Sequence, residues 1–181
     1  MCHTSVLTWA GSLPADLFAG RSVCEVGSYD VNGTVRPLIG AHGPASYLGV
    51  DISEGPGVDL VANVGDLPAQ FPDGFDTVIT TEMLEHVEDW REACEALVRL
   101  VAPGGSLVVT TRSPGFPYHP YPIDCWRYPP PVMRQILESA GLSVSVCIDD
   151  WEQSGVFAIA HKPKRWAAPK AWFESVEVPG V

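Results

Sequence analysis

The chain has 181 residues and a formal net charge of −11, with 22 acidic against 11 basic side chains. This length suits one α/β domain with its own core, and the negative charge disfavours a nucleic-acid substrate, whose phosphates it would repel. No apolar run approaches the length of a membrane span, and the first residues lack the basic start and apolar stretch of a signal peptide. The five cysteines are scattered and never spaced as C-x-x-C. We therefore expect a cytoplasmic protein with no metal site, no disulfide framework and no membrane or nucleic-acid partner.

Strands and helices alternate along the chain. Short apolar runs bounded by glycine, proline and aspartate predict strands at 23–27, 47–51, 58–62, 75–80, 106–111, 142–148 and 156–161. Helices are predicted at 5–9, from about 33 to 43, over 89–101 and from 131 to 140. This alternation predicts a mostly parallel sheet with helices on both faces.

The helix over 89–101 has the clearest pattern. Its apolar residues recur at helical spacing and form one stripe, made of Trp90, Ala93, Cys94, Leu97, Val98 and Val101. Asp89 is expected to cap its first turn, with Glu92 reaching back from the third helical position. A Pro-Gly-Gly sequence then ends the helix.

Acidic residues and a glycine turn mark the ends of the first two strands. The first strand ends in Glu25 and Gly27, and the second ends in Asp51. In an open α/β sheet such a glycine lets backbone approach a ligand, and such a carboxylate accepts hydrogen bonds from a ribose diol. Gly27 and Gly33 do not fit the G-x-G-x-x-G spacing of dinucleotide sites, and Glu25 with Asp30 would repel a pyrophosphate. A cofactor with a cationic end, such as S-adenosylmethionine, is therefore favoured over a dinucleotide.

Six segments together resemble the class I S-adenosylmethionine-dependent methyltransferases of the small stand-alone type. In chain order they are 25–28, 51–52, 63–68, 75–78, 82–87 and 100–107. The resemblance runs from about residue 23 to residue 142. It implies a Rossmann-like, doubly wound α/β fold with a mostly parallel seven-stranded sheet and an antiparallel last strand. It also implies S-adenosylmethionine as the cofactor.

The resemblance assigns roles at the cofactor site. Asp51 would hold the ribose hydroxyls, Ile52 would pack on one adenine face, and the carbonyl oxygen of Asn63 would accept from the adenine amino group. Glu25 would attract the α-ammonium of the methionine end. The residues expected to bind the cofactor are Glu25, Gly27, Ser28, Asp51, Ile52, Asn63, Val64 and Thr80.

The same resemblance suggests how the chain is divided. Residues 1–163 are expected to form a single methyltransferase domain, with residues 1–20 as an N-terminal helix and lid and residues 113–130 as a substrate loop. Residues 164–181 form a tail that contains three aromatic residues and two prolines. Packing of the tail on the body and packing on a partner both remain open, and a homodimer is one form of the second.

The 113–130 loop is long and follows a strand at the expected ligand edge, where long structured loops usually carry function. Methyl transfer to oxygen or nitrogen needs alignment and removal of a proton. His119 is the first candidate for the general base because imidazole titrates near neutrality, and Asp124 is the second. The residues expected to contact the substrate are His86, Tyr118, Tyr121, Trp126 and Arg127.

Simpler roles for these residues remain open. Asp124 and Arg127 have the spacing to pair with each other, the loop aromatics can cover the core, and His86 can be a hydrogen-bonded residue at a helix start. An acceptor that is already nucleophilic needs no base at all.

Three functions are compatible with the sequence. The first is methyl transfer from S-adenosylmethionine to an oxygen or nitrogen of a small molecule or sugar, whose face would suit the loop aromatics. The second is a nicotinamide-dependent oxidoreductase, which the missing G-x-G-x-x-G and Tyr-x-x-x-Lys patterns disfavour. The third is a non-catalytic binding or partner subunit that keeps the cofactor fold.

Overall fold

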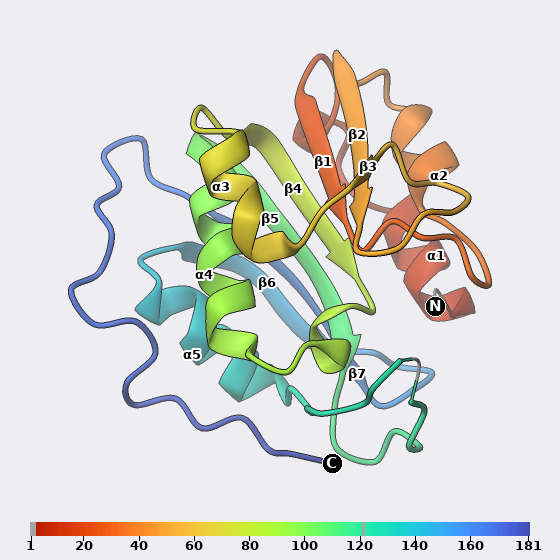
Figure 1. The fold of residues 1–181 in the computed structure, drawn as a ribbon, viewed down its shortest axis with the longest axis vertical. Coiled ribbons are helices and arrows are strands. Elements are labelled where there is room, and N and C mark those ends of the chain that lie inside the picture. The colour runs from red at the N-terminus through yellow and green to blue at the C-terminus, as the bar shows by residue number, and fades with distance from the viewer. Residues whose placement is uncertain (1–2, 121) are drawn as a thin grey trace.

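The computed structural model describes residues 3–120 and 122–181, and in these residues the chain forms one sheet with helices on both faces (Figure 1). The strands are β1 (Ser22–Val26), β2 (Ser46–Asp51), β3 (Leu60–Val61), β4 (Phe75–Thr81), β5 (Val101–Arg112), β6 (Ser143–Asp149) and β7 (Gly155–His161). Their order across the sheet is β3-β2-β1-β4-β5-β7-β6. The first five strands pair in parallel, whereas β7 is antiparallel to both β5 and β6. This confirms the predicted seven-stranded α/β sheet.

The helices divide between the two faces according to which strand residues they cover. The α-helices are α1 (Thr4–Gly11), α2 (Arg36–Gly40), α3 (Leu67–Gln70), α4 (Trp90–Leu100) and α5 (Pro130–Ser139), and the 3₁₀ turns are η1 (Ala15–Leu17), η2 (Val64–Asp66) and η3 (Leu84–His86). Helices α1 and α2 share a core cluster with Val23 of β1, whereas α3, α4 and α5 share the larger cluster with Cys24 and Val26. Successive strand residues point to opposite faces, so β1 supplies residues to both cores.

Several elements differ in detail from the sequence expectation: α2 and β3 are shorter than predicted, α3 was not predicted, and α4 and β5 differ at their starts. Asp89 caps α4 by accepting hydrogen bonds from the backbone N–H groups of Arg91 and Glu92, at 3.0 Å each. Glu92 does not complete the expected box: its carboxylate lies over Gly65. Strand β5 starts at Val101 rather than residue 106, because Val101 pairs with Phe75 before the register shifts.

The two ends of the chain pack on the body. Trp9 of α1 stacks on Phe157 of β7 with ring centroids 4.8 Å apart, so α1 belongs to the sheet's core. The tail runs past α4 and α5 (Figure 1) and buries Phe173 and Val176 in the larger core. Near its end, the Pro179 carbonyl accepts from the Arg127 N–H at 2.8 Å. Of the two possibilities left open by the sequence, the structure shows packing on the chain itself.

Within residues 3–120 and 122–181, no helix combines the length and the apolar composition that crossing a bilayer requires.

Lys162 ties the end of α4 to β7 and provides a test of this packing. Its ammonium donates to the carbonyl oxygens of Val98, at 2.9 Å, and Val101, at 2.6 Å, and lies 4.1 Å from the Trp166 ring centroid. These carbonyls lie where a helix runs out of backbone donors. Lys162→Met should therefore lower the free energy of unfolding in urea by about 2 kcal/mol.

Burial lowers the pKa of Lys162 to about 8, so the measurement belongs near pH 6.5, where the side chain is charged. The exposed Lys164 is the matched control, and Lys164→Met should change stability by less than about 0.5 kcal/mol. Equal stability of the two variants would contradict a stabilising role for Lys162.

Candidate functional site

A cavity of about 730 Å³ opens at the carboxyl ends of β1, β2 and β4. The strand order reverses between β1 and β4, and such switch points are where open α/β sheets bind ligands. The volume lies in the range of small-molecule and cofactor sites. The described residues that line it are Val26, Gly27, Tyr29, Val31, Asp51, Ile52, Ser53, Ala62, Asn63, Val64, Glu82, Met83, His86, Val87, Glu88, Asp89, Glu92, Ala93, Pro122 and Ile123.

Gly27 forms the turn that borders the cavity. Its φ is +84°, and a Cβ at this position would lie 2.8 Å from the Cβ of Met83. The N–H groups of Gly27 and Ser28 both donate to the Val50 carbonyl, at 2.8 and 3.0 Å. The turn is thus fastened to β2, and only glycine combines this backbone conformation with the close approach of Met83.

Asp51 ends β2 and Ile52 follows it, so a charged acceptor and an apolar side chain lie next to each other. One Asp51 oxygen accepts from the Tyr29 N–H at 3.2 Å and the other from the Ser53 N–H at 3.0 Å. Each carboxylate oxygen keeps a further acceptor position, so a diol can still bind. Ile52 lines the cavity with 62% of its surface exposed, which leaves an apolar face beside the acid for a flat ring.

Asn63 and Val64 form the wall after β3. The Asn63 side-chain oxygen caps η2 by accepting from the Gly65 N–H at 2.9 Å. A carbonyl oxygen has two lone pairs, so Asn63 can accept one more hydrogen bond from a ligand.

Three of the residues expected to bind the cofactor are not among the described residues that line the cavity: Glu25, Ser28 and Thr80. Each is buried, with at most 2% of its surface exposed. Glu25 follows Cys24 on β1 and so points away from α4, where its carboxylate accepts from the Tyr47 hydroxyl at 2.7 Å. Burial raises the pKa of Glu25 to about 7, and the attraction between Glu25 and a ligand ammonium stays a prediction.

The segment after β4 brings buried acids to the cavity edge, and sequence reasoning missed them. Glu82 lines the cavity with φ +54°, a strained conformation for a residue with a side chain. Its carboxylate accepts from the Thr110 hydroxyl at 2.9 Å and pairs with Arg112, which also contacts Asp150 at 3.4 Å. Burial and the neighbouring Glu85 raise the pKa of Glu82, against the opposing effect of Arg112.

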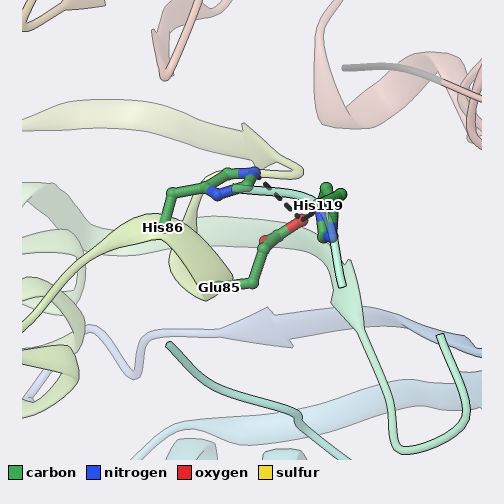
Figure 2. Close-up of side chains that lie close together, drawn as sticks. All are labelled: Glu85, His86 and His119. Carbon is green, nitrogen blue, oxygen red and sulfur yellow. Dashed lines mark ion pairs between the residues drawn. The ribbon is translucent and has the colours of Figure 1, made fainter. Parts of the chain in front are cut away.

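Glu85 is fully buried and faces two histidines (Figure 2). Its Oε2 accepts from the Thr111 hydroxyl at 2.7 Å, whereas its Oε1 has no hydrogen-bond partner among the described residues. Oε1 lies 3.9 Å from Nε2 of His86 and 3.9 Å from Nε2 of His119. Burial acts to raise the pKa of Glu85, but His119, His86 and Thr111 together hold it below its usual value.

Both histidines turn the same ring nitrogen toward Glu85. His86 Nδ1 lies 2.5 Å from the Ile123 carbonyl, and His119 Nδ1 lies 3.0 Å from Asp124 Oδ2. These oxygens accept hydrogen bonds, so Nδ1 carries the proton in each neutral ring and Nε2 has a free lone pair. The rings meet edge to face with centroids 4.9 Å apart. The Glu85 carboxylate raises the pKa of His119, and Asp124 adds to this against the effect of burial.

Asp124 and Arg127 are engaged with each other. Two guanidinium nitrogens donate to the two carboxylate oxygens, at 2.5 and 2.7 Å, and the His119 N–H donates to Asp124 at 2.8 Å. Burial would raise the pKa of Asp124, but Arg127 and His119 lower it to about 2. The structural pair left open by the sequence is confirmed, whereas Asp124 as a base and Arg127 as a substrate contact stay predictions.

The loop aromatics have separate places. Trp126 donates through its indole N–H to the Val87 carbonyl at 2.9 Å, which holds the loop against the segment after η3, and its role as a substrate contact stays a prediction. Tyr118 is 65% exposed and is not among the described cavity residues. Tyr121 lies outside the described residues.

Comparisons with known proteins agree with this geometry. A family model described as a methyltransferase domain matches residues 9–145. A ubiquinone biosynthesis O-methyltransferase from Pseudomonas entomophila is 32% identical over 107 residues, which cover 51% of this chain and 45% of that protein. The chain thus spans less than half the length of the curated relatives that it matches first.

Solved structures share the fold at low sequence identity. An S-adenosylmethionine-dependent methyltransferase from Mesorhizobium loti superimposes with a TM-score of 0.66 and 18% identity, covering 88% of this chain and 98% of that one. The 1,6-didemethyltoxoflavin-N1-methyltransferase of Burkholderia thailandensis, solved with S-adenosylhomocysteine, gives a TM-score of 0.67 and 15% identity, with 88% and 79% covered. Identities this low establish the fold alone.

The buried position of Glu25 should make the stability of the folded chain depend on pH. Its pKa is about 7 in the folded chain, against an ordinary value of 4.5. Between these values the folded chain holds a proton that the unfolded chain has lost, so this group makes stability fall as pH rises through the window. Glu25→Gln removes the titration and keeps an acceptor for Tyr47. The variant should therefore gain stability relative to the natural chain between pH 4.5 and 8, by at most about 3 kcal/mol.

Urea unfolding at several pH values measures this difference. Glu54→Gln, at an exposed position between β2 and β3, is the control and should follow the natural chain across the range. A Glu25→Gln difference that stays constant with pH would show that Glu25 is ionised in the folded protein throughout.

Proposed function

The chain belongs to the methyltransferase domain family, and from this premise we propose that it transfers a methyl group from S-adenosylmethionine to an oxygen or nitrogen of a small molecule or sugar. The observation that carries the proposal is one continuous cavity. At one end it has Asp51, Ile52 and Asn63, and at the other it has His86 and Ile123. A nucleoside cofactor bound at the first end would direct its reactive group toward the second.

In this proposal the residues at the nucleoside end supply the main contacts to the adenosine. Asp51 would accept from the ribose hydroxyls, Ile52 would pack on the adenine, and Asn63 would accept from its amino group, beside the Val64 backbone. Gly27 lets the β1 turn approach the ribose and methionine without a side chain in the way. In this proposal Glu25, Ser28 and Thr80, which are buried behind the cavity wall, hold the ends of β1 and β4 in place.

The other end of the cavity suits a polar acceptor. His86 and Ile123 line it. His119 is not among the described lining residues but packs edge to face on the His86 ring. The reaction is an in-line displacement, in which the acceptor forms a bond to the methyl carbon as the sulfur–methyl bond breaks and the sulfonium becomes a neutral thioether. The Glu85, His86 and His119 group is placed to promote loss of the acceptor's proton. Asp124 orients His119 through Nδ1, which makes it a positioning residue.

The name of the curated relative directs the choice of acceptor. That protein is an O-methyltransferase of ubiquinone biosynthesis, and the aromatic substrate loop here suits a ring-bearing hydroxyl compound. Substituted phenols and catechols are therefore the first acceptors to test, followed by sugars and aromatic amines. Tyr118, whose side chain is exposed, and Tyr121 remain proposed contacts for acceptors that extend beyond the cavity.

Asp51 provides the test of the cofactor site. Its two oxygens would accept charge-assisted hydrogen bonds from the ribose, so Asp51→Ala should weaken S-adenosylhomocysteine binding by roughly 30- to 150-fold. Isothermal titration calorimetry measures the change. A separate titration with NAD tests whether the natural chain prefers a dinucleotide. Glu54→Ala, in the same connection but exposed and outside the cavity, should bind with unchanged affinity. An Asp51→Ala affinity within about threefold of the natural chain would place the ribose elsewhere.

His119 provides the test of the acceptor end. Because it lies behind His86 and not against the nucleoside, His119→Ala should leave S-adenosylhomocysteine affinity within about twofold and lower turnover of a hydroxyl acceptor by roughly 100-fold or more. The control is His42→Ala, at a histidine that stacks on Phe18 in the other core, and it should keep full turnover. Loss of thermal stability with normal turnover per folded molecule would contradict a role in the reaction.

A further inference from the structure

We propose that Glu85, His86 and His119 form a binding site for a divalent first-row transition-metal ion, with Zn²⁺ as the expected occupant. Each residue offers one donor atom, and the three donor atoms lie within 4.8 Å of one another. Two come from the segment after β4 and one from the loop after β5, and Figure 2 shows them converging on one point. This proposal departs from the expectation of no metal site, which was based on the scattered cysteines.

The distances suit an ion after a small closure. Zn²⁺ binds nitrogen and oxygen donors at about 2.1 Å, which places the donors of a tetrahedral site about 3.4 Å apart. Oε1 of Glu85 is 3.9 Å from each histidine Nε2, so each donor has to move inward by less than about 1 Å. The 3.9 Å separations are also too long for hydrogen bonds, so no direct bond has to break for an ion to enter.

The surrounding residues prepare the donors for a metal. His86 Nδ1 is held by the Ile123 carbonyl, and His119 Nδ1 by Asp124. Metal-bound histidines characteristically donate their second N–H to a carbonyl or carboxylate in this way, which leaves Nε2 free to coordinate. Thr111 holds the other oxygen of Glu85 and so orients Oε1 toward the rings.

The unpartnered oxygen of Glu85 is the independent observation. The side chain is fully buried, yet Oε1 has no hydrogen-bond partner among the described residues. Buried polar atoms of this kind are rare and call for a bound water, an ion or a functional role. Arg112 is paired with Glu82 and Asp150 instead, so a cation between Glu85 and the histidines supplies the missing positive charge.

The donor set selects the class of ion. Two imidazole nitrogens and one carboxylate suit Zn²⁺, Co²⁺ or Fe²⁺ with an open coordination position, whereas Mg²⁺ prefers oxygen ligands and keeps several waters. His86 lines the cavity, so the open position faces the acceptor.

The role of the ion rests on the proposed function and narrows its substrate to hydroxyl compounds. An acceptor hydroxyl bound at the open position becomes more acidic and gives its proton to solvent. Its oxygen then forms the bond to the methyl carbon as the sulfur–methyl bond breaks. The sulfur keeps the bonding electron pair, and the products are a methyl ether and a thioether. In this scheme His119 holds the ion and does not itself take the proton.

The test measures metal binding directly, without turnover. The full chain is treated with a chelator, reduced, and titrated with Zn²⁺ and separately with Co²⁺, whose visible absorption reports its ligands. We expect one equivalent of each to bind, with a cobalt spectrum that lacks thiolate charge transfer. Mg²⁺ at the same concentrations should not compete. Failure to bind Zn²⁺ and Co²⁺, or equal competition by Mg²⁺, would overturn the site.

Variants locate the ion. His86→Ala and His119→Ala should each weaken Zn²⁺ binding by more than about 100-fold, and Asp124→Asn, which changes only the support of His119, by roughly 10- to 100-fold. His42→Ala should bind as the natural chain does. Glu85→Gln keeps the size of the buried side chain, and its cobalt spectrum should be lost or altered. Unchanged Zn²⁺ affinity in the His86→Ala, His119→Ala double variant would place the ion elsewhere and refute the proposal.

A parallel titration with S-adenosylhomocysteine separates this inference from the proposed function. Cofactor binding without metal binding would remove the ion and leave the methyltransferase proposal standing. Metal binding without cofactor binding would support the site and refute the reaction in which it is placed.

Discussion

Three consecutive residues of β5 hold the acids of the site, and the rest of the cavity edge depends on them. Thr110 and Arg112 bind Glu82, while Thr111 binds Glu85. Because neighbouring strand residues point to opposite faces, this alternation fixes the two acids on different sides of the sheet edge. Removing one partner of a buried ion pair costs about 3–5 kcal/mol, so Arg112 cannot be lost without disturbing the turn at Glu82.

The buried acidic side chains at this edge differ in how closely a positive charge is paired with them. Glu82 and Asp150 share the Arg112 guanidinium, and Asp124 has Arg127. Among the described residues, the Glu85 carboxylate accepts from the Thr111 hydroxyl and has two imidazole nitrogens at 3.9 Å, but it forms no ion pair with an arginine or lysine. A fully buried carboxylate with so little compensation is more costly than its neighbours, and such places are where proteins bind cations or move protons. The same feature thus links the stability of the edge to its chemistry.

Local sequence signals predicted the framework well. Alternating apolar runs and turn residues located the strands, Asp89 capped its helix, and Gly27 and Asp51 lie at the cavity as their strand-end positions predicted. These features depend on a few neighbouring residues, which is why one sequence reveals them. The sequence did not predict the roles of Glu82 and Glu85, because the β5 residues that bind them are far away along the chain.

Hydrophobic periodicity and turn chemistry act over short stretches of chain, so they predicted the sheet, most of its helices and the edge of the sheet at which the cavity opens. Which groups meet at that edge followed from the packing of distant segments. In the folded chain the Glu25 carboxylate contacts the Tyr47 hydroxyl, Asp124 pairs with Arg127, and His119 lies close to His86 and Glu85. The direction of a side chain on a strand depends on which face packs against which helix, and the approach of two loops depends on contacts between distant segments. No local pattern encodes either of these.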